Sequence, residues 1–189
     1  MNVLDIALIV TALGVAAMTF TQSPITTAAD VLACYAATVF AGAFYARIAA
    51  LPPFALLPLT DHASLSLGIF TGLLIGSALL LRRLARWATE VFSISRLGAG
   101  PLLGNALAAV LSVLLALVVV LVVVLAVAAV AQIPSGAGLP FLLRTQAASS
   151  FMLPRLTLPL DVYLRFVSIW FGGKMPQVYT DVVAVLHPL

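Results

Sequence analysis

The chain has 189 residues, of which 63% are hydrophobic and 8% are charged, and its formal net charge is +3. Charged residues make up about a quarter of an ordinary soluble domain, so this composition excludes a water-soluble globular protein. The basic residues do not form the clustered face that nucleic-acid binding requires, and we expect no nucleic-acid partner. The single cysteine, Cys34, excludes a disulfide or a cysteine-based metal site within one chain.

The first two apolar runs predict transmembrane helices over about residues 2–22 and 28–50. Runs of this length suffice because about 20 apolar residues cross a hydrocarbon core of about 30 Å. The first run lacks the positive n-region and cleavage site of a signal peptide, so we expect it to be a retained span. Pro24 and the hydroxyl residues of TQSPITT favour a tight turn between the two spans, which would form a helical hairpin.

Two further runs predict transmembrane helices over about residues 65–85 and 102–131. The third span follows the proline-rich connector LPPFALLPLTDH, through which a helix does not continue. The fourth begins near Pro101, and proline is favoured in a first helical turn. Its length of about 45 Å exceeds the bilayer, so it must tilt or keep its first turns at the interface. Residues 1–131 are therefore predicted to form a four-span transmembrane domain.

The orientation of the bundle is predicted from the connection between spans three and four. Arginine in short loops favours the cytoplasmic side of a membrane. This connection is expected to contain Arg82, Arg83, Arg86 and Arg96. It is therefore predicted to lie inside, with both termini of the chain outside the membrane.

Residues 132–189 are predicted to be a proline-rich outward tail with one short amphipathic helix at about residues 160–171. Asp161 lies near the start of this helix and Gly172 at its end, as helix boundaries favour. Tyr163 and Trp170 suit the headgroup level. The helix is expected to lie on the membrane or to fold onto the bundle, since Asp161 and Arg165 interrupt a run too short to span. Its shared apolar face is expected to comprise Leu164, Val167, Trp170 and Phe171.

The fold class follows from these elements. The sequence predicts an all-α, polytopic membrane helix bundle of four transmembrane helices with a short amphipathic helix in the C-terminal tail.

Two acidic residues are candidate ion-sensitive groups, because ionisable side chains inside a membrane are costly and are seldom placed there without a role. Asp5 lies one turn into the first span, and Asp30 is expected at the start of the second, where a helix N-terminus favours a carboxylate. The favoured interpretation of both is a helix cap or interfacial anchor. A proton relay is the alternative.

No residue pattern predicts a catalytic, cofactor or metal site, so we expect neither an enzyme nor a bound cofactor. His62 and His187 lie outside the predicted spans, whereas haem or chlorophyll ligands are expected at membrane depth. Asp61, His62 and Ser64 are neighbours in sequence, but a helix cap explains them more simply than a catalytic triad does. The sequence contains no phosphate loop, zinc spacing or nucleophile elbow.

Small residues recur at four-residue intervals in the third and fourth spans. Such stripes let helix backbones approach closely, and packing of span three against span four is the favoured interpretation. A permeation gap is the alternative, but it would require polar side chains along its length. The predicted packing positions are Gly68, Gly72, Gly76, Gly100, Gly104, Ala108 and Ser112. A similar stripe in the second span comprises Ala33, Ala37 and Ala41.

Four segments of the chain form a recognisable order: VLDIALIV with Asp5, YAATVFAGAFYARIA with its Phe44–Tyr45 pair, RLGAGPLLGNALAAVLSVLL, and ASSFMLPRL with Ser149, Ser150 and Pro154. Together they resemble the CvpA, or colicin V production protein, family of small four-span bacterial membrane proteins. The chain departs from the family in two places: TQSPITT carries no charge where the family has a basic loop, and AGP replaces an Asp-Arg pair before the fourth span. The resemblance implies a bacterial inner-membrane protein linked to colicin export and envelope integrity.

The functional expectation is an integral membrane scaffold or accessory protein of the bacterial cell envelope. An accessory subunit of a larger respiratory or photosynthetic complex is one alternative, and a small transporter or channel component is another. The expected partners are the lipid bilayer and either further copies of the chain or other membrane subunits.

Overall fold

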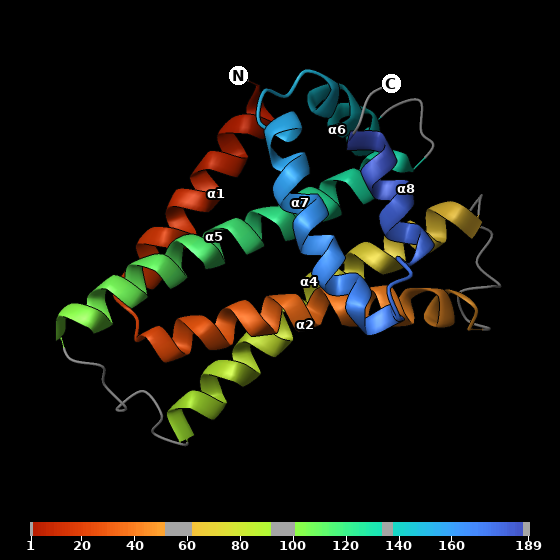
Figure 1. Cartoon of the computed structure of the whole chain (residues 1–189). Coiled ribbons are helices and arrows are strands. Elements are labelled where there is room, and N and C mark those ends of the chain that lie inside the picture. Colours follow the sequence, from red (N-terminus) through yellow and green to blue (C-terminus); the bar gives the residue numbers. More distant parts are fainter. Residues whose placement is uncertain (1, 52–61, 92–100, 134–137, 187–189) are drawn as a thin grey trace.

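The structure is a computed structural model that describes residues 2–51, 62–91, 101–133 and 138–186. These residues are almost entirely helical and contain no strand, which confirms the all-α prediction. Figure 1 shows long helices crossing one another, with the shorter helices of the C-terminal tail packed against one side of them.

The bundle is built from helices long and apolar enough to cross a membrane, and the chain is therefore a multi-pass membrane protein. None of the shorter tail helices meets that condition in the part of the chain described. The four long helices are α1 (Val3–Phe20), α2 (Pro24–Ala49), α4 (His62–Val91) and α5 (Pro101–Gln132).

The turn between α1 and α2 is shorter than the sequence predicted. Pro24 is the first residue of α2 and not part of the turn, and Ser23 caps the helix by accepting a hydrogen bond from the Thr26 N–H at 3.3 Å. Proline is tolerated there because its missing N–H would have no partner within the helix. The second span therefore begins four residues before the predicted start at residue 28.

α4 is longer than the predicted span of residues 65–85. It continues to Val91, because arginine is a good helix former even where it ends an apolar run. The prediction that Arg82, Arg83 and Arg86 belong to a loop is therefore wrong, since all three lie within α4. Arg96 lies outside the described residues.

The core forms where α5 contacts α1, α2 and α4. Leu115, Leu121 and Leu125 of α5 are at most 1% exposed, and Phe70 and Leu74 of α4 are fully buried. In Figure 1, α5 runs diagonally through the centre of the molecule. It thereby links α1 and α2 to the tail helices. α1 and α2 diverge from the turn that joins them (Figure 1), α1 packing on α5 and α2 on α4 and α5, so the predicted helical hairpin is wrong.

The tail has more regular structure than predicted, and its central helix begins at Leu153 and not near residue 160. Pro154 lies in the first turn, where it is favoured, and Pro159 is accommodated within the helix. The tail elements are α6 (Leu139–Ala148), α7 (Leu153–Ser168), a 3₁₀ turn (Ile169–Phe171) and α8 (Gln177–Leu186).

α7 folds onto the bundle and contacts α2, α5 and α8. Its inward face includes Leu164 and Val167, as predicted, and also Tyr163, which had been expected at the headgroup level. Trp170 is 69% exposed and therefore does not share that buried face. Of the two expected positions for this helix, the structure has the one folded onto the bundle.

Candidate functional site

Asp30 is a buried carboxylate within α2. It is the seventh residue of the helix, so it does not cap the N-terminus, and the interpretation as a cap is wrong. Its side chain is fully buried between α2 and α4. An isolated carboxylate at such a position would cost several kcal/mol of desolvation, so it requires compensating partners.

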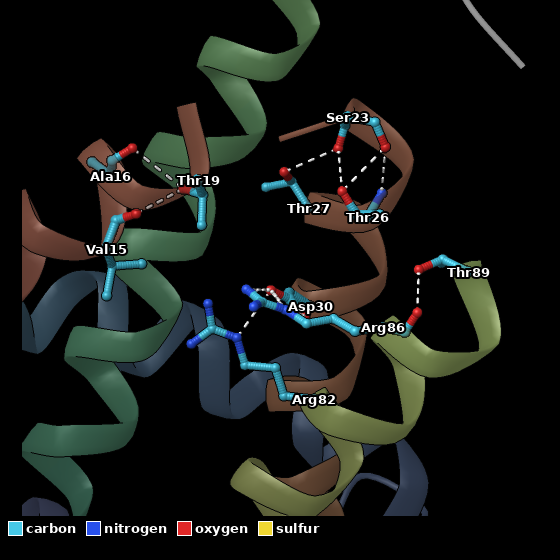
Figure 2. Close-up of polar contacts among 10 residues, drawn as sticks. All are labelled: Val15, Ala16, Thr19, Ser23, Thr26, Thr27, Asp30, Arg82, Arg86 and Thr89. Carbon is cyan, nitrogen blue, oxygen red and sulfur yellow. Dashed lines mark hydrogen bonds and ion pairs between the residues drawn. The ribbon is translucent and has the colours of Figure 1, made fainter. Parts of the chain in front are cut away.

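Two arginines of α4 supply that compensation, and we call Asp30, Arg82 and Arg86 the Asp30 cluster. Arg82 Nε donates to Asp30 Oδ2 at 2.9 Å, and Arg86 Nη2 donates to the same oxygen at 2.8 Å. Arg86 Nε donates to both carboxylate oxygens, at 3.3 and 3.1 Å. Figure 2 shows the carboxylate between the two guanidinium groups. The cluster therefore fastens the start of α2 to the end of α4.

The partners of Asp30 were missed because they are 52 and 56 positions away in the sequence. One available signal was their spacing, since residues four apart lie on the same face of a helix. That signal required α4 to extend through Arg86, whereas the predicted span ended at residue 85. The prediction ends this helix where the apolar run ends, whereas α4 continues to Val91.

Asp5 is also fully buried, and it joins α1 to the tail. It forms a capping box with Asn2, as the helix-cap interpretation expected. Its carboxylate also accepts hydrogen bonds from the tail: Ser150 Oγ at 2.5 Å, the Phe151 N–H at 3.2 Å and the Met152 N–H at 3.1 Å. A carboxylate with this many donors is stabilised as an anion. The contact to the tail was not predicted.

A third polar group, contributed mainly by tyrosines, fastens α7 and α8 to the middle of α2. The hydroxyls of Thr38 and Tyr163 are 2.7 Å apart, and the Tyr179 hydroxyl donates to the Thr38 carbonyl. Tyr35 Oη donates to the Phe166 carbonyl at 2.7 Å. Buried hydroxyls that are hydrogen-bonded in this way hold the tail in one position, since an unpaired hydroxyl would be costly.

This packing requires a glycine at position 42 of α2, because a larger residue there would clash with the tail. A Cβ at this position would lie 2.6 Å from an aromatic carbon of Tyr179. A glycine among small residues of an apolar helix suggests contact with another long helix, but the group that Gly42 accommodates is a tyrosine ring of the tail. Its partner is 137 positions away in the sequence (179 − 42), so local pattern could not identify it.

The glycine stripe of α4 is not filled by α5. Gly68, Gly72 and Gly76 are exposed, and a Cβ at any of them would meet no atom within 4 Å among the described residues. The predicted pairing of spans three and four through these glycines is therefore wrong for a single chain. The buried face of α4 is a different one, which carries Phe70 and Leu74.

The small residues predicted for packing in α5 are less exposed than the glycines of α4. Ala108 and Ser112 are buried, at 6% and 1% exposure. Gly104 and Ala108 line a cavity of about 480 Å³ beside the turn between α1 and α2. Gly100 lies outside the described residues. In α2, Ala33, Ala37 and Ala41 are all buried, and the Ser77 hydroxyl of α4 donates to the Ala37 carbonyl at 3.4 Å.

The described residues contain no group of three or more His, Cys, Asp or Glu side chains that could hold a metal ion. Cys34 is buried and has no disulfide partner. Asp61 lies outside the described residues, and the placement of the His62 side chain is not described. The chemistry that the site offers is therefore that of two buried, fully paired carboxylates, Asp5 and Asp30.

No protein-family model matches the chain, and no significant similarity to a curated protein or to a solved structure was found.

Proposed function

We propose that the chain is an integral membrane scaffold or accessory protein of the bacterial cell envelope, of CvpA type. The observation that carries this proposal is that both buried carboxylates are occupied by structural partners. Asp5 accepts hydrogen bonds from the tail and Asp30 is held by two arginines. A proton or ion relay requires a group that can release its partners, whereas these groups hold helices together.

The CvpA type in this proposal comes from the resemblance of four sequence segments to that family. Asp5 and Ser150 belong to two of these segments, and their side chains are hydrogen-bonded to each other. The proposal of an inner-membrane protein linked to colicin export and envelope integrity rests on this resemblance.

Gentle purification of the full chain, followed by identification of every protein that accompanies it, tests the scaffold proposal. We expect an envelope protein partner in stoichiometric amount, lost on washing with harsher detergent. Pigment-bearing or redox-active subunits in stoichiometric amount would instead favour an accessory subunit of a respiratory or photosynthetic complex. A chain that purifies alone under every mild condition would contradict the proposal.

The proposed orientation places the end of α4 in the cytoplasm and the tail outside, because arginines favour the cytoplasmic side. Lys174 is exposed in the tail, and Cys34 is buried. In a Cys34→Ser background, Lys174→Cys should react with a membrane-impermeant maleimide added to intact spheroplasts. Labelling only after the membrane has been opened would reverse the proposed orientation.

A further inference from the structure

The C-terminal end of α4 carries more positive charge than its partners neutralise. Asp30 compensates one of the two arginines in its cluster, and neither Nη atom of Arg82 finds an acceptor among the described residues. Arg83 is exposed and has no ion pair in the part of the chain described. Glu90, one turn beyond Arg86, is exposed and is the acidic residue that α4 itself contributes at this end. Three arginines and two carboxylates leave a net charge of +1 (3 − 2).

The length of α4 places these arginines at the edge of the membrane. Its 30 residues measure about 45 Å, which exceeds a hydrocarbon core of about 30 Å by about ten residues. Charged residues are costly inside the hydrocarbon, so the end that leaves it is the one that begins at Arg82. Trp87 is 63% exposed at this end, and tryptophan is enriched at the headgroup level.

One face of α4 that no described element covers leads from the apolar part of the helix to Arg83. Gly72, Gly76, Leu79 and Arg83 follow one another at intervals of four, three and four residues, so they lie on one face of the helix. The glycines leave space along this face, since no atom of the described part of the chain lies within 4 Å of an added Cβ, and Leu79 is 66% exposed.

We propose that this face of α4 binds an anionic phospholipid, with the phosphate at Arg83 and Arg86 and an acyl chain along Gly72 to Leu79. Guanidinium groups bind phosphate through paired hydrogen bonds, and basic residues at the cytoplasmic end of a transmembrane helix, where the proposed orientation puts the end of α4, attract anionic headgroups. A second copy of the chain fits less well, because two parallel α4 helices meeting along this stripe would bring Arg83 against Arg83. The charge of the site therefore selects the lipid.

The two tryptophans of the chain allow a direct test. Trp170→Phe leaves Trp87 as the reporter beside the site, and Trp87→Phe leaves Trp170 on the tail as the control. Each full-length variant is reconstituted in phosphatidylcholine bilayers that contain about one-tenth brominated lipid, either phosphatidylglycerol or phosphatidylcholine. We expect brominated phosphatidylglycerol to quench Trp87 fluorescence more strongly than brominated phosphatidylcholine does, and to show no such preference at Trp170.

Arg83→Gln should reduce the preference at Trp87 about fivefold, which corresponds to the loss of about 1 kcal/mol for one basic residue near an anionic membrane. Arg165→Gln, which removes an exposed arginine of α7, is the matched control and should leave the preference unchanged. Equal quenching by the two brominated lipids, or an equal loss in both variants, would overturn the proposal.

Two further measurements separate the lipid from other occupants. Inorganic phosphate at millimolar concentration should not reduce the quenching, and a reduction would assign the site to a soluble anion. In a Cys34→Ser background, Gly72→Cys should not form a disulfide-linked dimer at low protein density in the bilayer. Efficient cross-linking would assign this face to a second copy of the chain and overturn the lipid proposal.

Discussion

The side chains of Asp5 and Ser150, 145 positions apart in the sequence, are joined by a hydrogen bond of 2.5 Å. The same carboxylate accepts the Phe151 and Met152 N–H groups just before α7. One acidic residue in the first turn of α1 therefore completes the capping box of that helix and holds the segment just before α7. This relationship makes the tail part of the bundle and not an appendage.

Asp5→Asn should loosen the tail. The amide keeps the shape of the side chain but lacks its negative charge. Hydrogen bonds to a charged acceptor are stronger than neutral ones, so the contacts to the tail become weaker. We expect a loss of about 1–3 kcal/mol in the free energy of unfolding, together with faster tryptic cleavage after Arg155. Thermal unfolding in detergent and timed proteolysis measure the two effects. Asp181→Asn, at an exposed position, is the control and should change neither.

Asp30→Ala should destabilise the bundle by about 1–3 kcal/mol, because it leaves two partly exposed arginines without their shared partner. Replacing all three residues of the Asp30 cluster with apolar ones, as in Asp30→Leu with Arg82→Met and Arg86→Met, should restore much of that loss. Denaturant unfolding in mixed micelles compares the variants. A triple variant no more stable than Asp30→Ala would contradict the description of the cluster as a structural ion pair.

Gly42→Ala and Gly72→Ala make the same chemical change in two different environments. At Gly42 the new methyl group would lie 2.6 Å from the ring of Tyr179, so we expect a loss of about 1–3 kcal/mol from overpacking. At Gly72 an added Cβ would meet no atom within 4 Å among the described residues, and the gain in helix propensity should leave stability unchanged or raise it by about 0.5–1 kcal/mol. Melting temperatures of the two variants test this contrast, and equal losses would contradict it.

Tyr163→Phe and Ser112→Ala each remove one buried hydroxyl, and they should differ in sign. The Tyr163 hydroxyl is paired with Thr38 at 2.7 Å, so its removal should cost about 1 kcal/mol. Ser112 Oγ is buried and has no hydrogen-bond partner among the described residues, so its removal should be neutral or stabilising. The same unfolding assay measures both, and a destabilised Ser112→Ala variant would reveal a partner for that hydroxyl.

The sequence was sufficient to predict the four long helices, because an apolar run of membrane length is a local property. It was less informative about their ends. α4 continues to Val91 beyond the apolar run, and α2 begins at Pro24 before it, since helices extend into polar residues that hydropathy assigns to loops. The predicted spans of residues 65–85 and 28–50 were each too short at those ends.

The contacts of the candidate site could not be predicted from local pattern. Asp5 and Asp30 were identified because charges in apolar runs are conspicuous, but Ser150, Arg82 and Arg86 become their partners only once the helices have packed. The tail helix was predicted to begin near residue 160, because Pro154 and Pro159 suggested interruptions. In the fold, Pro154 occupies the first turn of α7, two residues after Met152, whose N–H donates to Asp5.

Ion flux into vesicles that contain the purified chain tests the central claim most directly, namely that the buried carboxylates hold the bundle together and do not conduct. A pH-sensitive dye inside the vesicles reports proton entry under an imposed gradient. We predict the same flux as in empty vesicles for the unmodified chain, for Asp5→Asn and for Asp30→Asn. Flux that the unmodified chain supports and that a correctly folded Asp5→Asn or Asp30→Asn variant abolishes would contradict the account.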